Sequence, residues 1–326
     1  MSSRPPVVLS IMSIDVNSTL GAMHIGVSAA GFLFGLTTAQ AVFYYTHYQR
    51  DQWYFKVLVG WTVFLDLFHQ ICIEHNGYMY EIANWDNPAA LLEAWWSLRA
   101  GVFTLGLITF TVQSFYVWRL WQLSQGYYLP TFVSILTLAT FCTTMYWFKI
   151  VLGLKMLSDI PAVQYLQTTV NALSAGTDVV IAFCMVWYLR HRRTGFEKTD
   201  GILGRLMVLC VNTGALTSIT ALWVIISASV WPQTQIYILF YYFLARFYSN
   251  SLLATLNVRN AIRRAGESNP SYELGYVSTG GMFAVAHPTA TPGASTGVVV
   301  QIDRTVGRDD KRPGIADDQE SINTTV

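Results

Sequence analysis

Residues 129–150 read LPTFVSILTLATFCTTMYWFKI, a run of 22 residues whose one charged side chain, Lys149, stands next to its end. At about 1.5 Å of rise per residue, a helix of this length spans roughly 33 Å. That is enough to cross a hydrocarbon core of about 30 Å. Comparable apolar runs recur up to about residue 260. The sequence therefore predicts an all-α fold, a polytopic membrane helix bundle.

Seven such runs divide the chain into a short N-terminus, a bundle and a tail. We predict transmembrane helices at residues 20–45, 54–74, 98–121, 129–150, 166–189, 202–230 and 235–258. The short connectors between them carry proline, glycine or charge. Residues 1–19 precede the seven-span domain of residues 20–264, and residues 265–326 are rich in Gly, Ser, Thr, Pro and charge. This composition predicts a disordered tail.

Composition and charge exclude several classes of protein. Only 12% of residues are charged while 53% are hydrophobic, which is not typical of a soluble globular domain. A net charge of +1, spread over loops, indicates no nucleic-acid partner. The four cysteines all lie inside apolar runs, so we expect no extracellular disulfide framework.

Basic residues in the short loops predict the orientation, because they concentrate on the cytoplasmic side. One side of the bundle collects Arg50, Lys56, Arg119, Arg190, Arg192, Arg193, Lys198, Arg205, Arg259, Arg263 and Arg264. With seven spans, the N-terminus is then extracellular or lumenal and the tail is cytoplasmic. We expect the plasma membrane or another membrane of the secretory pathway. The sequon at Asn17 is a glycosylation candidate, whereas the sequon at Asn323 would remain unmodified.

Ionisable residues near the span centres are the candidate functional residues, because each is costly in the bilayer unless it finds a partner or water. Asp66, Asp178 and Arg246 stand out, and we predict that Arg246 pairs with Asp178 or Asp66. Polar residues at helical spacing accompany them on faces that should point inward. The candidate core comprises Asp66, His69, Asn171, Asp178, Asn212, Arg246 and Asn250, with Gln113, Ser174, Thr213 and Thr217 as further hydrogen-bonding groups. It either lines a cavity or clamps the helices together.

Small residues in the first span predict close helix packing. Gly31 and Gly35 form a Gly-x-x-x-Gly pair, and Gly26 with Ala30 is a second small pair at the same spacing. Such residues let helix backbones approach closely. We expect them to pack inside the bundle.

The sequence also lacks the signatures of several seven-span families. No lysine lies between residues 234 and 258, where a retinal protein needs one for its Schiff base. No acidic residue precedes Arg119, and no Asn-Pro-x-x-Tyr motif occurs in the seventh span, in contrast to many G-protein-coupled receptors. The histidines are scattered, without a His-Glu-x-x-His motif. We therefore expect no enzyme activity, no catalytic residue, no metal site and no cofactor.

Two stretches carry a resemblance to a known family. One runs from Arg193-Thr194-Gly195-Phe196 to Asn212-Thr213-Gly214-Ala215-Leu216-Thr217-Ser218, and the other is residues 248–259, YSNSLLATLNVR. With Asp66-x-x-His69, Asp178 and Arg246, they resemble a fungal family of seven-span membrane proteins, expanded in mushroom-forming fungi, whose domain has no known function. The resemblance covers residues 20–264. It implies architecture and no activity.

Four functions fit these observations. The first is a receptor-like sensor that binds a small-molecule ligand and signals through the loop at residues 190–205 and the tail, where a cytoplasmic partner would bind. The second is a proton, ion or small-solute transporter or channel built on the intramembrane charges. The third is a membrane-embedded metal hydrolase, and the fourth is a scaffold whose only partner is membrane lipid.

Overall fold

The computed structural model describes residues 17–84, 87, 93–124, 126–154, 160–191, 197–231, 234 and 236–267. The predicted disordered tail beyond residue 267 and the first 16 residues lie outside this range. Residue 17 is the first described residue, and it opens the π-helical turn η1, Asn17–Gly21.

Every predicted span corresponds to one long helix. The helices are α2 (Ala22–His47), α3 (Trp53–Tyr78), α4 (Trp96–Leu123), α5 (Tyr128–Gly153), α6 (Ile160–His191), α7 (Glu197–Val230) and α8 (Ile236–Glu267), and a second π-helical turn, η2 (Met79–Ala83), extends α3. Most helices are longer than the predicted spans, because hydropathy marks only the part that lies in hydrocarbon. Pro130 fits into α5 because the first turn of a helix needs no backbone donor at that position.

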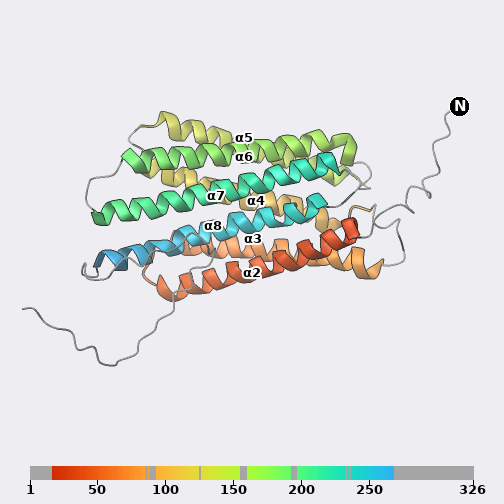
Figure 1. Ribbon diagram of the computed structural model, residues 1–326, viewed down its shortest axis with the longest axis horizontal. Coiled ribbons are helices and arrows are strands. Elements are labelled where there is room, and N and C mark those ends of the chain that lie inside the picture. The colour runs from red at the N-terminus through yellow and green to blue at the C-terminus, as the bar shows by residue number, and fades with distance from the viewer. Residues whose placement is uncertain are drawn as a thin grey trace, which may run out of the picture. The chain divides into compact units, whose positions relative to one another are not determined.

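Consecutive helices pack against one another, and α8 packs against α2, so that the order α2 to α8 forms a closed ring. Figure 1 shows the helix axes running along a common direction. Helix α4 also contacts α6 and α8 across the ring. It carries many of the bundle's buried residues, such as Ile108, Val112 and Leu120, and brings Gln113 into the interior.

Of the seven long helices in the described residues, six are long and apolar enough to cross a membrane, and the chain is a multi-pass membrane protein. Helix α8 is the exception in composition, because its interior turns carry polar residues such as Arg246 and Ser249. Both side chains are fully buried. The low hydropathy of α8 therefore reflects its position among other helices.

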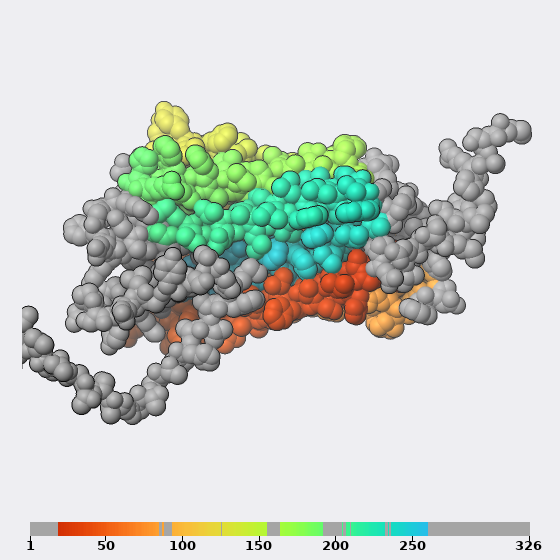
Figure 2. Space-filling view, in the orientation of Figure 1, coloured from red at the N-terminus to blue at the C-terminus, as the bar shows by residue number. Residues whose placement is uncertain are grey.

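Helix α8 nevertheless runs parallel to α2 along most of its length. Figure 2 shows part of α8 between α7 and α2 on one face of the bundle. Contacts recur in the same order along both helices, so α8 covers the same depth of membrane as α2. In order, they join Gly26 to Leu239, Leu33 to Asn250, and Gln40 to Asn257.

Large apolar side chains cover the outside of the bundle. Phe32, Phe64, Phe132 and Phe183, from four different helices, are each more than half exposed. In water such a surface would be unfavourable, whereas against lipid tails it carries no penalty. The distribution of apolar residues is thus that of a bundle embedded in a bilayer.

The small residues of α2 contribute unequally to packing. A Cβ atom added at Gly26 would lie 3.1 Å from the Leu239 Cα of α8, whereas at Gly35 it would meet nothing within 4 Å. At Gly31 the nearest atom, Gln70 Nε2, would be at an ordinary 3.5 Å. The close approach predicted for the first span therefore occurs at Gly26, and the expectation for Gly35 was wrong, because that position faces away from the neighbouring helices.

Candidate functional site

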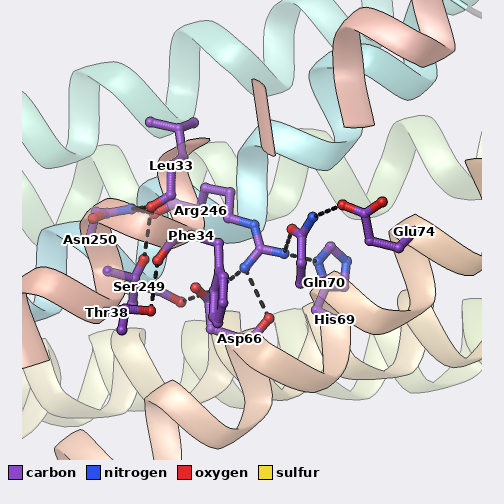
Figure 3. A network of polar contacts seen from close by, with 11 residues as sticks. Leu33, Phe34, Thr38, Asp66, His69, Gln70, Glu74, Arg246, Ser249 and Asn250 are labelled. Carbon is purple, nitrogen blue, oxygen red and sulfur yellow. Dashed lines mark hydrogen bonds and ion pairs between the residues drawn. The ribbon is translucent and has the colours of Figure 1, made fainter. Parts of the chain in front are cut away.

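Arg246 of α8 is the largest fully buried side chain of the described residues, and it pairs with Asp66 of α3. Its Nη1 lies 2.6 Å from Asp66 Oδ1 and also donates to the Asp66 main-chain oxygen at 3.0 Å. Both side chains have zero exposed area. The ion pair, drawn in Figure 3, therefore joins α3 to α8 in the interior of the bundle. Of the two carboxylates predicted as partners of Arg246, the structure pairs it with Asp66.

The second terminal nitrogen of Arg246 continues this network along α3. Nη2 donates to Gln70 Oε1 at 2.8 Å and lies 3.5 Å from His69 Nδ1. Gln70 Nε2 in turn donates to Glu74 Oε1 at 2.6 Å. Because Glu74 is exposed, a chain of polar side chains leads from the buried ion pair to the surface of the bundle.

Helix α2 closes the same network from the opposite side. The guanidinium carbon of Arg246 lies 5.5 Å from the centre of the Phe34 ring, a cation–π geometry. Asn250 donates from Nδ2 to the Leu33 main-chain oxygen at 3.2 Å, and Ser249 Oγ donates to Asp66 Oδ1 at 3.0 Å. The ion pair is thus held by α2, α3 and α8 together (Figure 3).

Asp178 of α6 is the centre of a second, separate network. Its Oδ1 accepts from Gln113 Nε2 of α4 at 2.9 Å. Its Oδ2 accepts from Thr217 Oγ1 of α7 at 2.8 Å and from Tyr248 Oη of α8 at 2.6 Å. Ser174 of α6 also hydrogen-bonds Tyr248 Oη, at 3.0 Å. One carboxylate therefore connects four helices.

The two carboxylates differ in charge balance. Asp66 has a cationic partner, whereas no ion pair to Asp178 forms among the described residues. All three donors to Asp178 are neutral. A cavity of about 20 Å³ lies beside this carboxylate, lined by Asp178, Gln113, Tyr116, Thr213 and Tyr248 together with Cys210 and apolar residues of α4, α6 and α7. The Gln113 Oε1 atom is buried and accepts no hydrogen bond from the described residues.

The remaining predicted core residues lie apart from these networks. Asn171 is buried in α6, but its Nδ2 has no hydrogen-bond partner among the residues that the structure describes. Asn212 lies on the exposed face of α7, so its assignment to the polar core was wrong. Successive helical residues point about 100° apart, and the next residue, Thr213, is the one turned inward. The Asn17 side chain lies outside the described residues.

Three participants were missed from the sequence. Gln70 bridges Arg246 to Glu74, Ser249 supports Asp66, and Tyr248 supports Asp178. Gln70 stands four residues after Asp66, so helical spacing could have found it. Ser249 and Tyr248 are neighbours in sequence yet join different networks, which no periodicity of one helix reveals.

Polar contacts also form at both ends of the bundle. Arg259 Nη2 pairs with Asp51 Oδ2 at 2.6 Å, and Tyr44 Oη donates to the same oxygen at 2.8 Å. At the opposite end, His24 Nδ1 lies 2.8 Å from Glu81 Oε2. Within the described part of the chain, no three His, Cys, Asp or Glu side chains gather as metal ligands.

A larger cavity opens on the outer surface between α3, α4 and α5. It has a volume of about 570 Å³ and is lined mainly by aromatic side chains. Trp61 Nε1 donates to Thr111 Oγ1 at 3.3 Å across it. We call it the aromatic groove, and its lining residues are Tyr54, Phe55, Leu58, Trp61, Leu107, Phe110, Thr111, Ser114, Phe115, Trp118 and Phe141.

These features define the class: a multi-pass, all-α membrane protein with two buried polar networks. Residues 174–261 match the model of a family described as a family of unknown function, DUF6534. The match runs from α6 into α8 and so includes Asp178 and Arg246, but neither Asp66 nor Gln113. No curated protein and no solved structure matches the chain.

Proposed function

We propose that the chain is a receptor-like sensor of a lipid-soluble small molecule that enters the aromatic groove from the bilayer. The groove is the observation that carries this proposal. Its volume of about 570 Å³ lies within the range of roughly 300–1,000 Å³ that is typical of small-molecule sites. The cavity beside Asp178, at about 20 Å³, is too small for such a ligand.

The lining of the groove favours a rigid, flat and largely apolar ligand with one polar group, such as a sterol. Aromatic rings from three helices form its walls; Phe110 of α4 and Phe141 of α5, for example, have ring centres 4.4 Å apart. Three hydroxyl groups, of Tyr54, Thr111 and Ser114, interrupt this apolar surface. Rigid aromatic walls suit a rigid ligand, because neither side loses much conformational freedom on binding.

The same helices connect the groove to both polar networks. On α4, Ser114 lines the groove while its neighbour Gln113 donates to Asp178. On α3, Trp61 lines the groove and Asp66 lies five residues further along. A ligand that displaced α3 relative to α4 would therefore change the geometry of both carboxylates. It would bind the displaced conformation of the bundle more tightly than the original one, and this difference in affinity shifts the population toward the displaced conformation.

Photolabelling tests this proposal. Full-length protein in lipid nanodiscs is irradiated with a diazirine-bearing sterol, and the labelled residues are identified by mass spectrometry. We expect saturable labelling at residues 54–61 and 107–118 that excess unlabelled sterol prevents. A diazirine-bearing straight-chain fatty acid, which tests ordinary lipid contact, should label the exposed faces of all helices.

Two matched substitutions provide the control. Ser114→Phe fills the groove and should reduce sterol labelling to the level of the fatty-acid probe. Ser28→Phe places the same side chain on the exposed face of α2, outside the groove, and should leave the labelling unchanged. Sterol labelling that is as widespread as that of the fatty acid, or that survives Ser114→Phe, would contradict the proposal.

A further inference from the structure

The Asp178 carboxylate presents an imbalance of charge inside the bundle. Its side chain is fixed by neutral donors from α4, α7 and α8, and residue 178 is only 7% exposed. Neutral donors spread a negative charge but do not cancel it. An ionised carboxylate in a low-dielectric interior is costly unless a cation accompanies it. Asp66 meets this requirement through Arg246, whereas Asp178 has no such partner among the described residues.

A second observation points to a ligand beside this carboxylate. Gln113 is 1% exposed and lines the same small cavity. Its amide nitrogen donates to Asp178, but within the described part of the chain its amide oxygen accepts no hydrogen bond. Buried acceptors are nearly always satisfied, so an exception calls for an explanation. Here an oxygen without a partner and an unbalanced carboxylate adjoin one cavity.

The size of the cavity restricts what could satisfy both groups. At about 20 Å³ it has room for a single particle of the size of a water molecule, which needs roughly 10–15 Å³. A water molecule could donate to Gln113 Oε1 but would leave the charge of Asp178 in place. A small monovalent cation satisfies both groups at once, since carboxylate and amide oxygens replace its hydration shell.

We propose that this cavity is a binding site for one Na⁺ ion, with the Asp178 carboxylate and Gln113 Oε1 as ligands. One positive charge neutralises the single carboxylate, whereas a divalent cation would leave an excess charge in the interior. Tyr116, Thr213 and Tyr248 add three hydroxyl groups to the lining. Because Asp178 connects α4, α6, α7 and α8, Na⁺ binding stabilises the packing of these four helices.

Direct binding to the wild-type protein is the primary test. Full-length protein in nanodiscs is titrated with ²²Na⁺ at constant ionic strength, with N-methyl-D-glucamine chloride as the balancing salt. We expect saturable binding of one ion per chain, and weaker competition by the larger K⁺ than by unlabelled Na⁺. Absence of saturable binding would overturn the proposal.

Thermal unfolding with matched variants locates the ion. Replacing N-methyl-D-glucamine by Na⁺ should raise the Tm of the wild type in a concentration-dependent way, as for any ligand of the native state. Asp178→Asn, which keeps the side-chain shape, should lose the shift, and Gln113→Leu should reduce it. Asp51→Asn makes the same change in the ion pair at the end of the bundle and should retain the full shift. A shift that survives Asp178→Asn would exclude this site.

Discussion

At the scale of single residues, Asp66 and Asp178 show how two buried carboxylates in one bundle differ in their surroundings. Asp66 is neutralised by Arg246, and both side chains have no exposed area. Asp178 instead receives three neutral hydrogen bonds. A buried ion pair is strongly destabilised when one partner is removed, because the other charge is left without compensation.

Arg246→Gln tests this difference. The substitution leaves Asp66 without its cation and should lower the free energy of unfolding by about 3–5 kcal/mol. The double variant Arg246→Gln with Asp66→Asn removes both charges and should regain a large part of that loss. Both changes can be measured by reversible unfolding in mixed micelles of mild detergent and SDS. Equal losses in the single and double variants would show that the charge of the pair is unimportant for stability.

At the scale of helices, α2 and α8 show that a small residue matters only where another backbone approaches it. Helix α8 comes within 3.1 Å of the Cβ position at Gly26, while the Cβ position at Gly35 is open. Helix α8 is the partner of α2 in this contact. Its middle turns are more polar than those of the other helices. Close packing at Gly26 and hydrogen bonds from Asn250 therefore act together in docking α8 onto α2.

A pair of glycine substitutions should separate these positions. Gly26→Val forces α2 away from α8 and should destabilise the protein by about 1–3 kcal/mol, the usual cost of overpacking. Gly35→Val places the same side chain in open space and should change stability by less than about 0.5 kcal/mol. The unfolding assay used for Arg246 measures both. Equal destabilisation at the two positions would mean that valine acts through its effect on the helix itself.

At the scale of the whole molecule, the course of α8 bears on the topology. This helix is less apolar than the other six helices, yet it lies parallel to α2 over the same depth. If α2 crosses the membrane, α8 crosses it in the same direction. Seven crossings place the two ends of the chain on opposite sides, and the basic loops predict that the N-terminus is the outer end.

Glycosylation mapping in cells provides the test. A sequon in an extension added before Met1 should be modified, because the N-terminus is predicted to meet the lumen of the secretory pathway. Asn323 in its natural sequon should remain unmodified. A gel shift that is reversed by an endoglycosidase reports each site. Modification of Asn323 would contradict the proposed orientation, and modification at neither position would place both ends in the cytoplasm, with an even number of crossings.

The helices can be predicted from the sequence alone. Their number and approximate bounds follow from the length and hydropathy of each run, which are local properties that hydrocarbon enforces on any chain. The ionisable residues at membrane depth also stand out in the sequence, because each must find a partner wherever it lies. Asp66, Asp178 and Arg246 are recognisable on these grounds alone.

Which of these residues meet depends on how the helices pack. Arg246 could pair with either carboxylate, and the packing of α8 against α2 and α3 brings it to Asp66. The packing of the other helices leaves Asp178 to neutral donors, turns Asn212 outward and forms the aromatic groove between α3, α4 and α5. The rotation of each helix about its own axis depends on its neighbours, and an apolar sequence that suits both lipid and protein carries little information about that rotation.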